Sequence, residues 1–165
     1  MLFSGGRGSG ALTSQLVSNP RVDLVVAING YDDGASTGEV RRFLGDALGP
    51  SDFRKNASRL SRTLRTAPEA LVDLLDQRLP DDLQERSTAR ALVTAMTGAS
   101  PDARLDGLAR LAGSLPEPAC AAVRRALERF AEELETSGRP FRFADTSVGN
   151  LVFAGSYLLA GRRFN

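Results

Sequence analysis

Residues 23–38 read DLVVAINGYDDGASTG, an apolar run followed by a turn with two carboxylates, two small hydroxyl side chains and several glycines. The run at 23–28 is rich in valine and isoleucine, which predicts a strand buried on both faces, as in a parallel sheet. In open α/β sheets, ligands bind outside the carboxyl ends of the strands. The turn therefore predicts a site in which Asp32 and Asp33 take part. The alternative is a simple turn, because Asp and Gly both favour turns.

The composition narrows the chemistry available to such a site. The chain has 165 residues, a net charge of +1, one cysteine and no histidine. Histidine catalysis, imidazole metal sites and thiolate clusters are excluded, so a metal ion would have oxygen ligands, and Mg²⁺ is the leading candidate. The overall charge does not suggest nucleic acid as a partner. No apolar run approaches the roughly 20 residues that cross a bilayer, and no signal-peptide pattern is present. We therefore expect a cytoplasmic protein with no membrane partner.

A second glycine-rich turn precedes this segment. Residues 1–4 predict a short strand, the sequence GGRGSG at 5–10 a tight turn, and residues 11–18 a short helix. This arrangement aims backbone N–H groups and the helix dipole at a phosphate. With the strand at 23–28 it forms a right-handed β-α-β unit with parallel strands, so both turns leave the sheet at the same edge. The alternative is a tight connection with no ligand.

A basic helix is predicted from the pair Ser51 and Asp52, either of which can cap it, to residue 64. Arg54 and Lys55 lie at its start, where they are candidates for contact with a phosphate. Later arginines are spaced by three residues and so share one face of the helix. Two of them are expected to be solvated: Arg62 and Arg65.

Residues 67–137 contain four amphipathic helical patterns, broken by proline and glycine, and no convincing strand. We expect an α/β part at 1–66, a helical insertion at 67–137 and a return to the α/β part at 138–165. The fold class is α/β, a parallel sheet with a mostly helical insertion. Only two or three strands are predicted, the third at 141–143, whereas sheets commonly have about four to six. We therefore expect an incomplete sheet that a further segment or a second copy in a homo-oligomer completes.

The last polar motif is DTSVGN at 145–150, which leads into an apolar helix at 151–159. Polar groups at a helix start form an anion-binding N-terminus. The alternative is a simple N-cap by Thr146 or Ser147.

Four motifs in this order resemble those of the CofD-like family. They are GGRG at 5–8, DDGASTG at 32–38, PSDFR at 50–54 and SVGN at 147–150. The family contains the 2-phospho-L-lactate transferases of coenzyme F420 biosynthesis and the YvcK-type gluconeogenesis factors. The closer likeness is to the YvcK-type series GGTG, DDGGSSG, PPGDIRN and HSLGN. Departures from that series include Arg7 for threonine, Lys55 for asparagine and Thr146 for histidine.

The resemblance implies a Rossmann-like α/β fold that binds a nucleoside diphosphate-linked molecule of the GDP or UDP type. Carried over residue by residue, it implies three catalytic and metal-binding carboxylates: Asp32, Asp33 and Asp52. Together with the reading of the turns and helix starts, it gives the following ligand-binding residues: Gly5, Gly6, Arg7, Gly8, Ser36, Thr37, Arg54, Lys55, Ser147, Gly149 and Asn150.

Three functions are compatible with these residues. The first is a CofD-like, Mg²⁺-dependent transferase that moves a phospho-acid group from a nucleoside diphosphate-linked donor to an acceptor hydroxyl. The second is a YvcK-type regulatory factor that binds a UDP-sugar without turnover. The third is a dinucleotide-binding oxidoreductase, which the pattern G-x-G-x-x-A of Gly6, Gly8 and Ala11 suggests.

Overall fold

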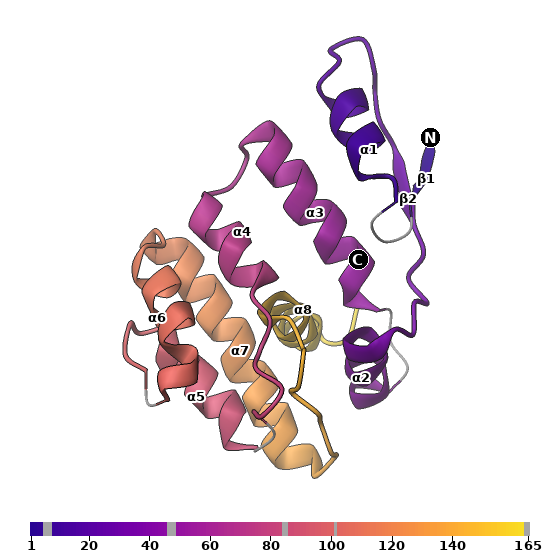
Figure 1. The fold of residues 1–165 in the computed structure, drawn as a ribbon. Helices are drawn as coiled ribbons and strands as arrows, with labels where there is room; N and C mark the ends of the chain where they lie inside the picture. The colour runs from indigo at the N-terminus through magenta and orange to yellow at the C-terminus, as the bar shows by residue number, and fades with distance from the viewer. Residues whose placement is uncertain (5–7, 46–48, 84–85, 101, 164–165) are drawn as a thin grey trace.

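The computed structural model describes residues 1–165 except 5–7, 46–48, 84–85, 101 and 164–165. The described chain is mostly helical and contains a two-stranded sheet (Figure 1). The elements are β1 (Leu2–Ser4), α1 (Gly10–Val17), β2 (Val26–Ile28), α2 (Ala35–Leu44), α3 (Pro50–Leu64), α4 (Glu69–Asp76), α5 (Ser87–Ala95), a 3₁₀ turn (Ala103–Leu105), α6 (Asp106–Gly113), α7 (Glu117–Ser137) and α8 (Val148–Leu159). None of the described helices is both long and apolar enough to cross a bilayer.

The two strands are parallel, as the pattern predicts, and Phe3 pairs with Ala27. Helix α1 connects them, so the described chain is compatible with an α/β fold. The prediction of a strand buried on both faces is wrong. The strand begins at Val26 rather than at residue 23, and the Phe3 side chain is 81% exposed. The sheet is exposed because the hydrophobic core is built from helices that lie to one side of it (Figure 1).

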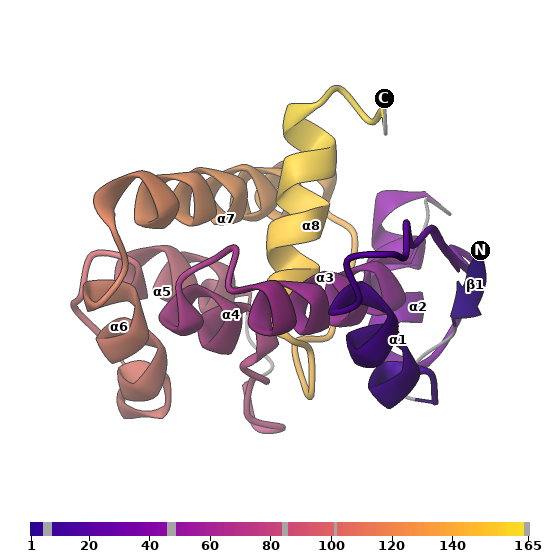
Figure 2. The same ribbon diagram turned by 90° about the horizontal axis from the view of Figure 1, so that it is seen from above.

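The core unites all three predicted segments of the chain. Helix α2 contributes Val40 and Phe43, the helices of residues 67–137 contribute most of the remainder, and α8 contributes Leu151. Helix α8 crosses α7 closely (Figure 2). A Cβ atom at Gly155 of α8 would overlap the carbonyl oxygen of Ala126 of α7, so only glycine permits this approach.

The strand predicted at 141–143 is also wrong, and the reason lies in the core. Phe141 and Phe143 are buried, whereas Arg142 between them is exposed. The Phe141 ring packs against Phe43 of α2 and Phe130 of α7, with centroid separations of 5.4 Å and 5.1 Å. The Phe143 ring packs against Phe130 at 6.3 Å. The alternation of buried and exposed side chains at 141–143 therefore comes from an irregular segment that packs one face on a helical core. In the described chain this segment pairs with no strand.

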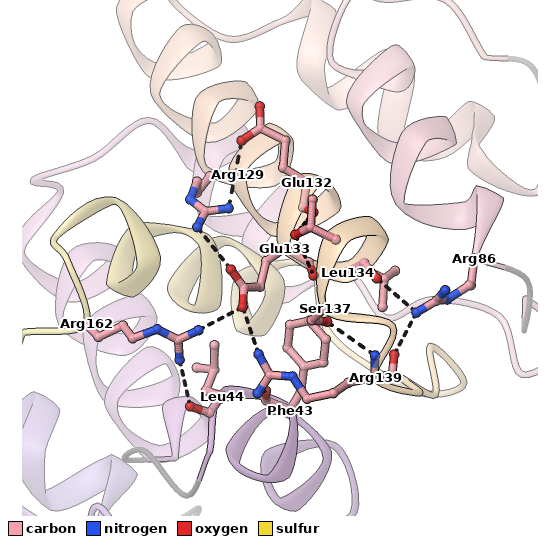
Figure 3. Close-up of polar contacts among 11 residues, drawn as sticks. Phe43, Leu44, Arg86, Arg129, Glu132, Glu133, Leu134, Ser137, Arg139 and Arg162 are labelled. Atoms are coloured by element: carbon pink, nitrogen blue, oxygen red, sulfur yellow. Dashed lines mark hydrogen bonds and ion pairs between the residues drawn. The ribbon is translucent and has the colours of Figure 1, made fainter.

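A buried carboxylate joins α7 to the end of α2 (Figure 3). Glu133 Oε1 lies 2.7 Å from Arg139 Nη2 and 2.8 Å from Arg162 Nη2, and Glu133 Oε2 lies 3.0 Å from Arg129 Nη2. Two of these arginines also donate to carbonyl oxygens at the end of α2: Arg139 to Phe43 and Arg162 to Leu44. The last carbonyls of a helix have no partner within it, so the arginines supply one.

Candidate functional site

The first turns of α2, α3 and α8 meet at one point. The side-chain amide of Asn150 in α8 donates to the hydroxyl of Ser36 in α2 at 3.2 Å and to that of Ser51 in α3 at 3.0 Å. Thr37 of α2 also donates to Ser51. We call Ser36, Thr37, Ser51 and Asn150 the helix-start junction. Three of the four predicted motifs therefore share one hydrogen-bond network, although Ser36 and Asn150 are 114 positions apart.

Most of the junction is interior. Asn150 is 0% exposed, Thr37 2% and Ser51 5%, whereas Ser36 is half-buried. Buried polar side chains that are fully hydrogen-bonded fix a unique arrangement, so these residues hold the three helix starts together. Of the junction, Ser36 is the side chain that a ligand reaches most directly.

Two glycines allow the helix starts to approach. Gly49 precedes α3, and its N–H donates to the Gly30 carbonyl at 2.7 Å. A Cβ atom at Gly49 would overlap Thr37 Cγ2, and one at Gly149 would lie 2.6 Å from the Leu75 carbonyl oxygen. Both glycines are thus required by close contact.

The predicted cap of α3 is wrong, whereas the cap of α8 is confirmed. Helix α3 begins at Pro50 with Gly49 as its N-cap, which leaves Ser51 inside the first turn. Proline suits the first helical position because its fixed φ matches the helix. In α8, Ser147 is the N-cap, and its hydroxyl accepts the Asn150 N–H at 3.3 Å. Ser147 is buried and engaged in that role.

Arg54 extends the junction toward α4. Its Nε donates to Asn150 Oδ1 at 3.2 Å, and its Nη1 pairs with Asp76 at the end of α4. Burial lowers the pKa of Arg54, and the adjacent Asp76 carboxylate opposes that shift. Ser58 donates to the same carboxylate at 3.0 Å, so Asp76 is held from more than one side.

The three predicted carboxylates have different surroundings. Asp32 accepts the Gly34 N–H at 3.2 Å at the start of α2. Asp33 is exposed and lies 3.6 Å from Arg41 Nη1. Asp52 is buried, 3.4 Å from Lys55 Nζ. Among the residues that the structure describes, no group of three or more His, Cys, Asp or Glu side chains is placed to hold a metal ion.

The first glycine-rich turn is described only in part, because Gly5, Gly6 and Arg7 lie outside the described residues. Gly8 is exposed, and the helix that follows packs on α3. Ser4 donates to Asn56 Oδ1 of α3 at 3.2 Å, and the Arg59 guanidinium lies beside Gly10, where a Cβ atom would be 3.0 Å from Arg59 Nε. The start of α1 is therefore close to the middle of α3.

A hollow of about 350 Å³ lies over this face of α3. Its walls are mostly cationic, and we call it the basic hollow. It is lined by Arg54, Lys55, Ser58, Arg59, Arg62, Asp76 and Arg78. The sequence singled out Arg54 and Lys55, and helical spacing points to the other residues of α3. No local pattern could include Asp76 and Arg78, which come from the end of α4 and the segment after it.

Comparisons with protein-family models, curated proteins and solved structures find no match to this chain. The likeness to the CofD-like family consequently depends on the four sequence motifs.

Proposed function

We propose that this chain is the nucleotide-binding part of a Rossmann-like, CofD-like protein that binds a nucleoside diphosphate-linked molecule. The helix-start junction carries this proposal. Ser36, Ser51 and Asn150 come from three separate motifs and share one hydrogen-bond network. The network fixes the three helix starts relative to one another, and motifs brought together from distant parts of the chain are what a single ligand site requires.

Anion binding at this point has a physical basis. The N-termini of α2, α3 and α8 each carry the positive end of a helix dipole. In α8 the N–H groups of Val148 and Asn150 are already bonded, to the Gln77 carbonyl and to Ser147, so the dipole is what this helix contributes to the proposal. Arg54 and Lys55 add positive charge beside the junction. A diphosphate that contacts Ser36 would lie within this positive region.

The carboxylates at the start of α2 explain why such a ligand would need Mg²⁺. Asp32 and Asp33 would repel a diphosphate placed beside them, and a cation between the groups removes that repulsion. Mg²⁺ in enzymes is commonly held by one or two carboxylates together with substrate phosphates. In our proposal Asp32 and Asp33 would supply those carboxylates.

As a transferase, the protein would move a phospho-acid group to an acceptor hydroxyl. The hydroxyl oxygen forms a bond to the phosphorus of that group as the bond to the bridging oxygen breaks. The bridging oxygen leaves with the electron pair as part of a nucleoside monophosphate, and the hydroxyl proton passes to a carboxylate, for which we propose Asp32. Charge neutralisation and alignment supply most of the catalysis in such reactions, so a histidine is not required.

A YvcK-type regulator that binds a UDP-sugar without turnover is the second candidate. The observation that favours it is the engagement of one carboxylate, since Asp33 lies within 4 Å of Arg41 and Arg42. An ion pair with arginine occupies carboxylate oxygens that a metal ion would otherwise use. No described contact favours the oxidoreductase over these two.

Thermal unfolding with GDP, UDP-N-acetylglucosamine and NAD, each with and without Mg²⁺, tests the proposal. A ligand present at a hundred times its dissociation constant stabilises the fold by about 2.7 kcal/mol. We expect this with GDP or the UDP-sugar in the presence of Mg²⁺. Stabilisation by NAD alone, or by none of the three, would contradict the proposal. A transfer product detected by mass spectrometry separates the enzyme from the regulator.

The variant Asp33→Asn sharpens this test. It should weaken the Mg²⁺-dependent part of nucleotide binding and leave the fold intact, because Asp33 is exposed. Asp23→Asn is the matched control, since Asp23 is also exposed but precedes β2, at the opposite end of the strand from Asp33. Equal Mg²⁺ dependence of nucleotide binding in the two variants would show that Asp33 does not take part in the site.

A further inference from the structure

The proposed function uses Arg54 and Lys55 of the basic hollow and leaves its other cationic side chains unexplained. Its described lining holds five cationic side chains and one carboxylate. The carboxylate, Asp76, is shared by Arg54 and Arg62, and Asp73 provides a further partner for Arg62 at 2.8 Å. Three more cations line the same space: Lys55, Arg59 and Arg78.

We propose that the basic hollow binds a multiply charged phosphate anion, of the pyrophosphate or triphosphate class. This inference goes beyond the proposed function because it requires neither a nucleoside nor group transfer. The hollow has a volume of about 350 Å³, within the range of roughly 300–1,000 Å³ of small-molecule pockets. Arginine suits this ligand because its planar guanidinium donates two parallel hydrogen bonds to a phosphate.

Of the carboxylates that face these cations, Asp145 is one that a ligand can displace. Lys55 is 3.4 Å from Asp52, and Arg78 is 2.7 Å from Asp145, whose side chain is exposed. Exposed ion pairs contribute little to stability. A phosphate that carries several negative charges can therefore replace Asp145 as the partner of Arg78.

The position of Arg59 links the basic hollow to a helix start. Its Nη1 donates to Asn56 Oδ1 at 3.3 Å, and its guanidinium lies beside Gly10, the first residue of α1. A helix start adds backbone N–H donors and a positive dipole. A phosphate in the hollow would thus meet cationic side chains from α3, Arg78 beyond α4, and the start of α1.

The binding should be independent of Mg²⁺, in contrast to that at the helix-start junction. Asp32 and Asp33 are absent from the lining of the basic hollow as described, and its five cationic side chains outnumber its one carboxylate, so a phosphate needs no metal ion to offset repulsion there. This difference lets one experiment separate the two sites.

The test is a calorimetric titration of the whole chain with pyrophosphate and tripolyphosphate, in EDTA and at constant ionic strength. We expect binding, and affinity that is roughly tenfold weaker in Arg59→Gln and in Arg78→Gln, since a hydrogen bond to a charged group is lost. Arg110→Gln is the control because Arg110 is exposed on α6, away from the hollow. It should bind within about twofold of the unaltered chain, since it removes no bond to the anion.

Absence of pyrophosphate binding would overturn the proposal, as would equal loss of affinity in Arg110→Gln. If Arg59→Gln binds as tightly as the unaltered chain while circular dichroism shows both folded, the assignment to this hollow fails.

Two further arms of the experiment identify the source of the anion. A nucleoside diphosphate that binds no tighter than pyrophosphate in EDTA supports a site for the phosphates alone. A short DNA duplex that binds tighter than tripolyphosphate, with the same loss of affinity in both variants, would contradict the proposal of a small anion and show that the hollow binds nucleic acid.

Discussion

The helical part of the molecule and the sheet with α1 are held together by different forces. Helices α2 and α4–α8 enclose a continuous hydrophobic core with a cluster of four phenylalanines. The sheet leaves Phe3 exposed, and Val25 directly before β2 is exposed as well. The sheet contacts α3 through polar groups such as Ser4 and Asn56. The helix-start junction lies where these parts meet. The helical part therefore supplies stability, and the candidate site stands at its border with the less buried part.

The largest expected effect comes from removing a core ring. Phe130→Ala should destabilise the chain by about 3–5 kcal/mol, because it leaves a cavity in the phenylalanine cluster. Phe3→Ala should change stability by less than about 0.5 kcal/mol, since that side chain is already in water. Denaturant unfolding measures both. Comparable losses would mean that the sheet carries as much of the fold as the helices.

The Glu133 cluster is expected to have the next largest effect. Glu133→Gln removes the charge that holds Arg139 and Arg162, and we expect a loss of about 2 kcal/mol, below the 3–5 kcal/mol of fully buried pairs because the arginines are partly exposed. Glu135→Gln is the control, since its pair with Arg90 is at the surface. Unfolding curves for the two variants should separate clearly. Coincident curves would show that the Glu133 ion pairs do not stabilise the fold.

The close packing at this border can be tested by substituting a glycine there. Gly149→Ala should cost about 1–3 kcal/mol through overpacking, because its Cβ would overlap Arg54 and crowd the Leu75 carbonyl. Gly113→Ala on α6 has no neighbouring atom within 4 Å, and should be neutral or stabilising by up to about 1 kcal/mol. The melting temperatures of the two variants should move in opposite directions, or only that of Gly149→Ala should fall. A stable Gly149→Ala would contradict the close approach of α8 and α3.

The smallest expected effect is the pH dependence of stability that comes from surface ion pairs of the helical part. Arg104 lowers the pKa of Asp102, and Arg90 lowers that of Glu135. A carboxyl with a lowered folded pKa stabilises the chain above its unfolded pKa, and that contribution is lost as the pH falls through the folded value. Stability should thus decline slightly as the medium is acidified below the ordinary carboxyl range, and Glu135→Gln should flatten that part of the profile. An unchanged profile would show that the Arg90 pair makes no contribution.

The sequence predicted the elements that depend on local pattern. The helical periodicity at 67–137 corresponds to α4–α7, and the capping preference of Ser147 is realised in α8. The alternation of Phe141 and Phe143 was misread as a strand, because a buried face looks the same in sequence whatever covers it. The apolar run at 23–28 was misread as fully buried for a related reason: hydrophobicity does not reveal whether a covering layer exists.

The candidate site was predicted in part. The resemblance and the reading of the turns and helix starts predict that Ser36, Thr37 and Asn150 lie together. The structure joins them in one hydrogen-bond network, Thr37 through Ser51. Asp76 and Arg78 could not be predicted, because they meet α3 only after α4 has folded back on it. The role of Glu133 was missed for the same reason, since its arginine partners include one 29 positions away.

Backbone amide spectra of isotope-labelled protein, recorded as GDP or UDP-N-acetylglucosamine is added with Mg²⁺, test the central claim most directly. The account predicts that the largest shifts fall together on the starts of α2, α3 and α8, including Ser36, Ser51 and Asn150, with the same concentration dependence. Shifts confined to one of these helix starts, or located on α5 and α6, would contradict it.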